Sequence, residues 1–282
     1  MADYSGETMN EVHSQKLVAC CQAIIRRPDL PESVWTGRSA ADWLGSVTRG
    51  QDQEKFDFSI QTFDTLTRNR PELLQKISDA RADYAVEPSD KLVRELVVDV
   101  LAWGGMGTKY GRTALPAWES WKHACVGLFN GSLNASEAYE CFYELQRDRR
   151  MPGIGPAYYT KLIFFLGKGD GLIMDQWTGR SVNLLFGNFI RIDREHAAPD
   201  RATVNSQNKA AVYLKYIDHV QKVASHLSAS LNKDISTDKA EEFLFSISPK
   251  KKPRTLNRDQ HAVVSAWRKH VIESDRTQRL QS

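Results

Sequence analysis

Apolar residues recur every three to four positions along most of the 282-residue chain, which is the spacing of one face of an α-helix. The alternation of apolar and polar residues that marks β-strands is almost absent. The pattern predicts an all-α protein, with helices over residues 12–27, 56–67, 71–82, 91–103, 120–129, 135–146, 157–166, 210–231, 238–245 and 259–274.

The connection between the expected helices at 135–146 and 157–166 contains Gly153, Ile154, Gly155 and Pro156. Glycine tolerates positive φ and lets another backbone approach closely, and proline fits the first position of a helix. The N–H groups at such a helix start attract anions, and the helix dipole adds to this attraction. The segment predicts a helix-hairpin-helix that holds a DNA phosphate, but an ordinary tight connection between two helices fits these residues equally well.

Asp175 follows an apolar stretch and precedes another expected helix. An aspartate at such a boundary is most often a helix N-cap. A carboxylate at the edge of a cleft can also stabilise a sugar cation or activate a water molecule. The two roles are compatible, because an N-cap position holds the carboxylate rigidly.

Together these residues resemble the helix-hairpin-helix (HhH-GPD) DNA glycosylases, in which a Gly/Pro-rich hairpin and a buried helix precede an aspartate that opens a helix, with an arginine a few residues later. Here these features are Met151–Pro156, Ala157–Leu166, Asp175 and Arg180. The sequence looks most like the bacterial 8-oxoguanine DNA glycosylase-like group, which leaves open that this chain is an anti-phage member, and the likeness is specific over residues 150–185. The resemblance implies that Asp175 is the catalytic aspartate. It also implies that the hairpin amides hold a backbone phosphate, sometimes through a bound alkali cation.

In the resembling family the helices form two lobes, and the DNA and a flipped base occupy the cleft between them. The resemblance places residues 50–170 in the lobe with the helix-hairpin-helix. It places residues 1–49 and 171–282 in the second lobe, which carries the catalytic aspartate.

Two positions depart from the family pattern. Bifunctional members have a nucleophilic lysine just after the hairpin, where this chain has Ala157. Lys161 lies one helical turn later and faces the same side, so a displaced catalytic lysine stays open. Many members have histidine two residues after the aspartate, where this chain has Trp177. We expect Trp177, with Tyr158 or Tyr159, to form aromatic walls near the base.

Two further segments carry basic residues. Residues 104–109 are glycine-rich but lack the spacing of a phosphate-binding P-loop, so they are either a flexible helix end or a DNA-facing loop. In the second case Lys109 and Arg112 would contact phosphates and Met106 would act as a wedge. The basic run at residues 249–254 is either a solvated loop or a nonspecific phosphate contact.

Composition limits the remaining choices. The net charge of +3 is mildly basic, so a DNA surface must come from local clustering. The chain has no apolar run of membrane-spanning length and no signal-peptide pattern at its start, which predicts a cytoplasmic, nucleoid-associated protein. Its four scattered cysteines fit neither a disulfide scaffold nor an iron–sulfur cluster, and its histidines lack zinc-ligand spacing. We therefore expect no metal or cofactor, apart from the alkali cation at the hairpin.

These observations predict a monomeric, monofunctional DNA glycosylase that acts on double-stranded DNA containing a modified base. Its substrate would be 8-oxoguanine, in repair, or a hypermodified phage base such as glucosylated hydroxymethylcytosine, in antiviral defence. The alternative is a noncatalytic helix-hairpin-helix DNA-binding protein, and Asp175 separates the two because a binding module has no need of that carboxylate.

Overall fold

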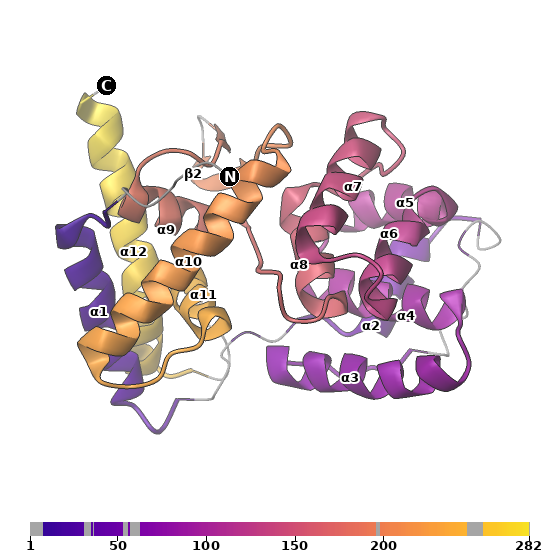
Figure 1. Cartoon of the computed structure of the whole chain (residues 1–282), viewed down its shortest axis with the longest axis horizontal. Coiled ribbons are helices and arrows are strands. Elements are labelled where there is room, and N and C mark those ends of the chain that lie inside the picture. The colour runs from indigo at the N-terminus through magenta and orange to yellow at the C-terminus, as the bar shows by residue number, and fades with distance from the viewer. Residues whose placement is uncertain are drawn as a thin grey trace. The chain divides into compact units, whose positions relative to one another are not determined.

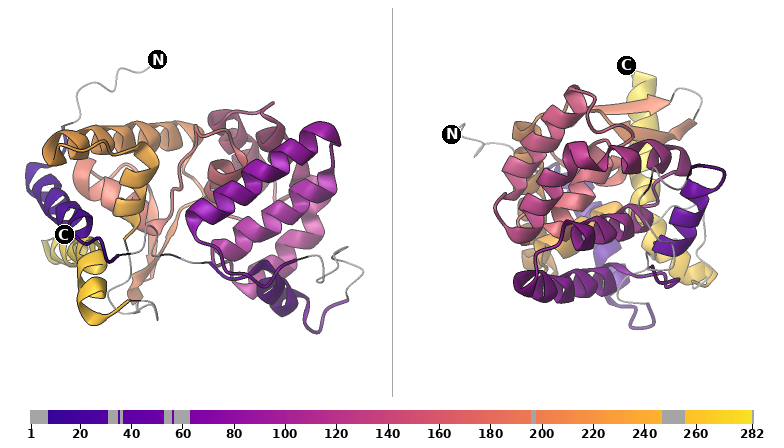
Figure 2. Two further views of the ribbon diagram at one scale, coloured as in Figure 1. Left: turned by 90° about the horizontal axis from the view of Figure 1, so that it is seen from below. Right: turned by 90° about the vertical axis from the view of Figure 1, so that its right-hand side faces the viewer.

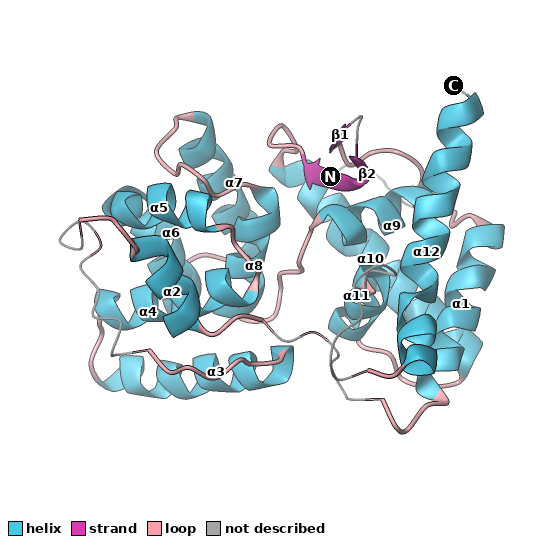
Figure 3. Cartoon of the chain, turned by 180° about the vertical axis from the view of Figure 1, so that it is seen from behind, coloured by secondary structure: helices cyan, strands magenta, loops and turns pink. Residues whose placement is uncertain are grey.

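The computed structural model of the chain describes residues 8–30, 35, 37–52, 56, 63–195, 198–246 and 256–281. Helices dominate this described part, and strands β1 and β2 form a two-stranded sheet (Figure 3). The all-α class predicted from the sequence is therefore confirmed. No helix within these ranges is both long enough and apolar enough to cross a membrane.

The described residues divide into two compact units. We call Ser33–Ile173 the hairpin unit, and Met1–Glu32 with Met174–Ser282 the aspartate unit. The expected boundary near residue 50 differs from this division, because α2 (Ala40–Thr48) belongs to the hairpin unit. Its buried face packs against α4 (Asp90–Trp103) and α5 (Thr108–Ala114).

In the hairpin unit, α4 contacts α2 and three other helices (Figures 1 and 2). These are α3 (Arg70–Val86), α6 (Trp118–Asn130) and α8 (Pro156–Leu166), while α7 (Ala135–Arg147) packs against α6 and α8, and the 3-10 helix η3 (Leu115–Ala117) leads into α6. Reciprocal capping boxes fix the starts of α3 and α7. Every residue of α8 from Tyr159 onward is buried, as its nearly all-round apolar sequence predicted.

In the aspartate unit, α9 (Gln176–Phe186) contacts each of the other helices of that unit. These are α1 (Glu11–Ile25), α10 (Ala210–Leu231), α11 (Thr237–Phe245) and α12 (Arg258–Gln281). Strands β1 (Ile192–Glu195) and β2 (Ala198–Val204) pair antiparallel, with Ile192 opposite Val204, and both contact α9. Helix α9 is therefore held from several sides.

One predicted helix is wrong, and some elements were not predicted. Within the expected helix at 56–67, the described residues 56 and 63–67 are not helical. There the carboxylate of Asp64 accepts a hydrogen bond from the Leu66 amide and pairs with Arg68, which competes with helix formation. The ribbon β1–β2 and the short helices α2 and α5 were not predicted. The basic run at 249–254 and residues 57–62 lie outside the described residues.

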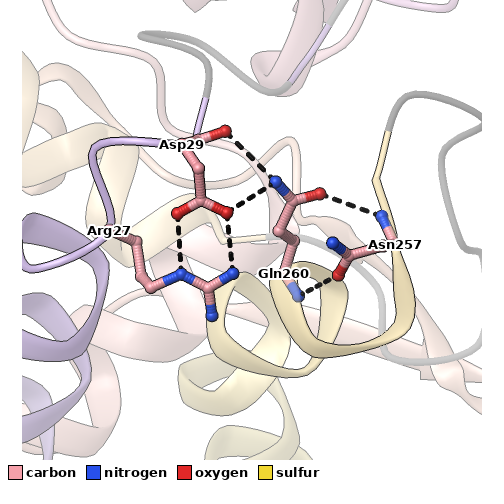
Figure 4. A network of polar contacts seen from close by, with 4 residues as sticks. All are labelled: Arg27, Asp29, Asn257 and Gln260. Carbon is pink, nitrogen blue, oxygen red and sulfur yellow. Dashed lines mark hydrogen bonds and ion pairs between the residues drawn. The ribbon is translucent and has the colours of Figure 1, made fainter.

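A polar network joins the end of α1 to the start of α12 (Figure 4). Arg27 donates two hydrogen bonds to the carboxylate of Asp29, and the Gln260 amide donates to both the carboxylate and the carbonyl oxygen of Asp29. These hydrogen bonds, first from Arg27 and then from Gln260, lower the pKa of Asp29. Gln260 and Asn257 also bond each other's backbone N–H groups in a capping arrangement, so one cluster fixes both helix ends.

A buried ion pair joins α9 to α12. Arg180 Nε lies 2.7 Å from Oδ2 of Asp275, and the two side chains are 1% and 7% exposed. Arg194 of β1 approaches the other carboxylate oxygen at 3.3 Å. Removing one partner of such a pair leaves a buried charge without its main counter-charge.

We expect Arg180→Met to lower the free energy of unfolding by about 3–5 kcal/mol, because Asp275 would keep its desolvation cost and lose its main partner. The control is Arg147→Met, which removes an arginine that is 58% exposed and pairs with Glu144 and Asp148 at the surface. It should cost at most about 1 kcal/mol. Urea unfolding monitored by circular dichroism measures both, and equal small losses would contradict the assignment.

Candidate functional site

The helix-hairpin-helix begins where α7 ends. Arg149 has a φ of 59°, and the amides of Arg149 and Arg150 donate to the carbonyls of Gln146 and Leu145, at 3.0 and 2.8 Å. This is the Schellman pattern, in which a left-handed residue closes the helix. An arginine holds the position that glycine usually takes, so the chain turns towards the hairpin with an exposed cationic side chain at the corner.

The hairpin itself turns at Gly153, which has a φ of 79°. A Cβ atom there would lie 2.7 Å from Oγ1 of Thr113 and 2.8 Å from the carbonyl oxygen of Tyr110. Only glycine meets both demands without strain. The side chains of Met151 and Ile154 are buried on either side and anchor the turn. Ile154 is thus a packing residue whose backbone, rather than its side chain, is available to a ligand.

Unpaired backbone amides lie between the hairpin turn and the start of α8. Gly155 is the N-cap and supplies no side-chain hydrogen bond, and Pro156 has no N–H. Among the described residues, no acceptor receives the backbone N–H of Gly153, Gly155 or Ala157. Converging unpaired amides at a helix start form an anion site. The geometry fits the predicted phosphate contact.

Asp175 is the N-cap of α9 and is 7% exposed. Its Oδ1 accepts hydrogen bonds from the amides of Trp177 at 2.7 Å and Thr178 at 3.1 Å. The Thr178 hydroxyl in turn accepts from the Asp175 amide at 3.0 Å, which completes a capping box. Within the described ranges no group donates to Oδ2. The carboxylate is therefore held by one oxygen and keeps the other for a ligand or a water molecule.

Arg268 of α12 supplies a cation behind this carboxylate. It is buried, and its Nη2 donates to the carbonyl oxygens of Phe245 and Ser246 at 2.8 and 2.7 Å. Burial lowers the pKa of Arg268 to about 9, and the negative charge of Asp175 acts in the opposite direction. Arg268 therefore stays protonated at neutral pH and contributes positive charge close to Asp175.

Trp177 does not present an open aromatic face. The guanidinium carbons of Arg268 and Arg180 lie 4.2 and 4.5 Å from the centre of its ring. Cation–π contacts of this kind hold an indole ring in place. Trp177 thus fixes the start of α9, and we no longer expect it to be a wall of the base pocket. We predicted that Arg180 contacts DNA. Its side chain is instead buried against Asp275.

Comparison with known families places the chain. Residues 43–245, well over half of the chain, match the OGG family, described as "Putative 8-oxoguanine DNA glycosylase OGG-like protein". The chain belongs to this OGG-like family. No curated protein and no solved structure matched it.

In this OGG-like protein, the two tyrosines that follow the hairpin differ in burial. Tyr159 is fully buried, edge-on to Tyr139 and stacked on Phe142 at 5.6 Å between ring centres. It is a core residue, and we drop it as a base-pocket wall. Tyr158 is only half-buried and remains a candidate.

Lys161 lies on α8 beside the end of α4. Its Nζ donates to the carbonyl oxygen of Ala157 at 2.8 Å and lies 5.6 Å from the centre of the Tyr158 ring. A Cβ on Gly104 would come within 2.7 Å of its side chain. The amine of this buried lysine thus has a structural acceptor one turn back along its own helix.

The glycine-rich loop before α5 is partly structural. Met106 is fully buried, and its carbonyl oxygen accepts a hydrogen bond from Trp43 at 2.7 Å, so its side chain is not available as the wedge that the DNA-facing interpretation of this loop suggested. Arg112 is exposed, but its guanidinium donates to the carbonyl oxygens of Val47 and Arg49 at the end of α2. Lys109 is exposed, and its contact with a DNA phosphate stays a prediction.

Arg268 was not identified from the sequence. The detectable signal is its place on the buried face of α12, in the series Val264, Arg268, Val271 and Asp275. A charged residue at a helical position that otherwise carries core residues must find a partner inside the protein. Such a residue marks a candidate site even without a motif.

The two hairpin glycines should respond differently to alanine. Gly153→Ala should destabilise the protein by at least about 1–2 kcal/mol, because alanine would have to adopt left-handed backbone geometry and its methyl group would meet Tyr110. Gly155 has ordinary backbone geometry, and its nearest neighbour would be Nε2 of Gln146 at 3.7 Å.

Gly155→Ala should therefore keep the stability within about 0.5 kcal/mol and weaken binding to all DNA sequences alike, because its methyl group stands where a phosphate would approach. Thermal unfolding and fluorescence anisotropy with two unrelated duplexes measure the two effects. Normal DNA affinity in a folded Gly155→Ala variant would remove the hairpin from the DNA contact.

Proposed function

We propose that this OGG-like protein is a monofunctional DNA glycosylase in which Asp175 is the catalytic carboxylate. The observation that carries the proposal is the different hydrogen bonding of the two Asp175 carboxylate oxygens. One is fixed by two α9 amides, and the other receives no donor from the described residues. A noncatalytic DNA-binding protein has no use for an anion held ready in this way.

The proposed reaction begins with extrusion of a modified nucleotide, because its glycosidic bond cannot be reached inside the base stack. The unpaired amides at Gly153, Gly155 and Ala157 hold the distorted backbone through a phosphate. As the bond between C1′ and the base nitrogen breaks, positive charge grows on the sugar and Asp175 Oδ2 stabilises it. A water oxygen then bonds to C1′, and its proton balances the charge of the released base.

The geometry after the hairpin supports hydrolysis over lyase chemistry. Attack by an amine would form a Schiff base and then cut the strand. The position directly after the hairpin is Ala157, and the Lys161 amine is engaged with the Ala157 carbonyl oxygen. A shift of one helical turn is about 5 Å, which is large against the reach that such an attack needs.

For the substrate, we propose 8-oxoguanine first, in line with the family description. Ala157 and Trp177, which depart from the family pattern, favour testing a second substrate class in parallel. This class is the hypermodified pyrimidines of phage DNA, such as glucosylated hydroxymethylcytosine, whose removal would leave abasic sites that block viral replication. Mass spectrometry of the bases released from duplexes and phage DNA separates repair from defence.

Asp175→Asn should abolish base release while the fold is kept. Asparagine caps a helix as well as aspartate does, so stability should change by less than about 1 kcal/mol. Loss of the negative charge should slow base release by about a hundredfold or more. Asp148→Asn, which alters an exposed aspartate paired with Arg147, is the control and should remain active. Near-full activity of folded Asp175→Asn would leave the noncatalytic binding protein as the better account.

Borohydride should trap little or no covalent protein–DNA adduct during turnover, because the proposed route has no Schiff base. Strand breaks should then require added alkali or heat, as a gel assay of product strands reports. Lys161→Ala provides the counter-test. Strong trapping that disappears in this variant would make Lys161 the nucleophile and the enzyme bifunctional.

A further inference from the structure

Tyr110 is the exposed aromatic residue closest to the hairpin. Its side chain is 50% exposed, and in the described part of the chain only Trp35 joins it among the strongly exposed aromatic residues. The indole of Trp35 donates a hydrogen bond to the carbonyl oxygen of Trp103. The Tyr110 ring instead lies over Gly107, 3.4 Å from the position that a Cβ atom would take there. A solvent-exposed aromatic ring beside the hairpin is a candidate contact for a ligand.

The backbone of Tyr110 is rigidly joined to the hairpin turn. Its carbonyl oxygen and Cα lie 2.8 and 3.3 Å from the Cβ position of Gly153, which is why that position excludes a side chain. Its amide donates to Gly107, and its carbonyl oxygen accepts a hydrogen bond from Thr113 Oγ1 at 2.9 Å. The ring therefore projects from a fixed point that touches the phosphate-binding turn.

The neighbouring groups suit a nucleic acid surface. Lys109 is exposed next to Tyr110, and the unpaired hairpin amides belong to the same unit. Base–aromatic stacking tolerates every base and accompanies such cationic, phosphate-binding surfaces. Proteins that distort duplexes also place a side chain into the stack where base pairing is disturbed.

We propose that the Tyr110 ring stacks on the base next to the extruded nucleotide and supports the distorted duplex while the hairpin holds the phosphate. Tyr110 is a positioning residue and takes no part in bond breaking. This inference rests on the proposed function, and it gives Tyr110 the role that the sequence suggested for Met106.

The test uses a duplex with a tetrahydrofuran abasic-site analogue and a 2-aminopurine beside it, so that no cleavable base is needed. Tyr110→Ala should weaken binding by about tenfold or more, and Tyr110→Phe by less than about twofold, because the ring rather than the hydroxyl makes the contact. The slope of affinity against salt should stay unchanged in Tyr110→Ala, because no phosphate contact is lost. Lys109→Ala should lower that slope if Lys109 contacts a phosphate.

Emission of 2-aminopurine gives the second readout. Saturating wild-type protein and Tyr110→Phe should quench it by stacking, and Tyr110→Ala should not. Val86→Ala, which trims another exposed apolar residue of the same unit, is the control and should bind and quench like the wild type.

Unchanged affinity and quenching in Tyr110→Ala would overturn the inference, as would an equal loss in Tyr110→Phe, which would indicate a hydroxyl contact instead. Both outcomes differ from failure of the proposed function, in which the wild-type protein would release no base from any modified duplex, whether or not it binds the abasic duplex. A normal melting temperature for Tyr110→Ala, expected for a half-exposed side chain, confirms that loss of binding is not loss of fold.

Discussion

The cap at the start of α9 is the interaction on which the rest of the candidate site depends. Two backbone amides hold a single oxygen of Asp175, which sets the position of the carboxylate without using its second oxygen. The carboxylate is thereby part of a helix end, and it can move only if that helix end moves. The aspartate unit is arranged to prevent such movement. Trp177 packs with two guanidinium groups, Arg180 pairs with Asp275 on α12, and the Gln176 side chain accepts the Ala202 amide of β2.

In the hairpin, side chains supply the packing, and backbone amides are left for the proposed phosphate contact. Met151 and Ile154 are buried, Gly153 leaves room for Tyr110, and the amides of Gly153, Gly155 and Ala157 stay without protein acceptors in the described ranges. Under the proposed function, such a surface would hold a phosphate without reading the base sequence. The specificity for a modified base that we propose would then come from groups beyond the hairpin, among which half-buried Tyr158 and exposed Tyr110 are the aromatic candidates.

The features predicted correctly from the sequence are local ones. A Gly-Pro turn, an all-round apolar helix and an aspartate before a helix each follow from a few neighbouring residues. The errors concern contacts between distant residues. Nothing near Arg180 indicates that Asp275 will pair with it, and nothing in the pair Tyr158 and Tyr159 shows that the second stacks on Phe142. The ribbon β1–β2 is short, and α9 supports it from outside, so it gives little signal of its own.

The measurement that tests the central claim most directly compares two abasic-site analogues in one duplex. One is neutral tetrahydrofuran, and the other is a pyrrolidine whose protonated nitrogen imitates the sugar cation of the transition state. If Asp175 Oδ2 meets that charge, the wild-type protein should bind the cationic duplex at least about tenfold more tightly, and Asp175→Asn should bind both alike. Equal binding by the wild type, or a preference that survives in Asp175→Asn, would contradict the assignment of Asp175 as the catalytic carboxylate.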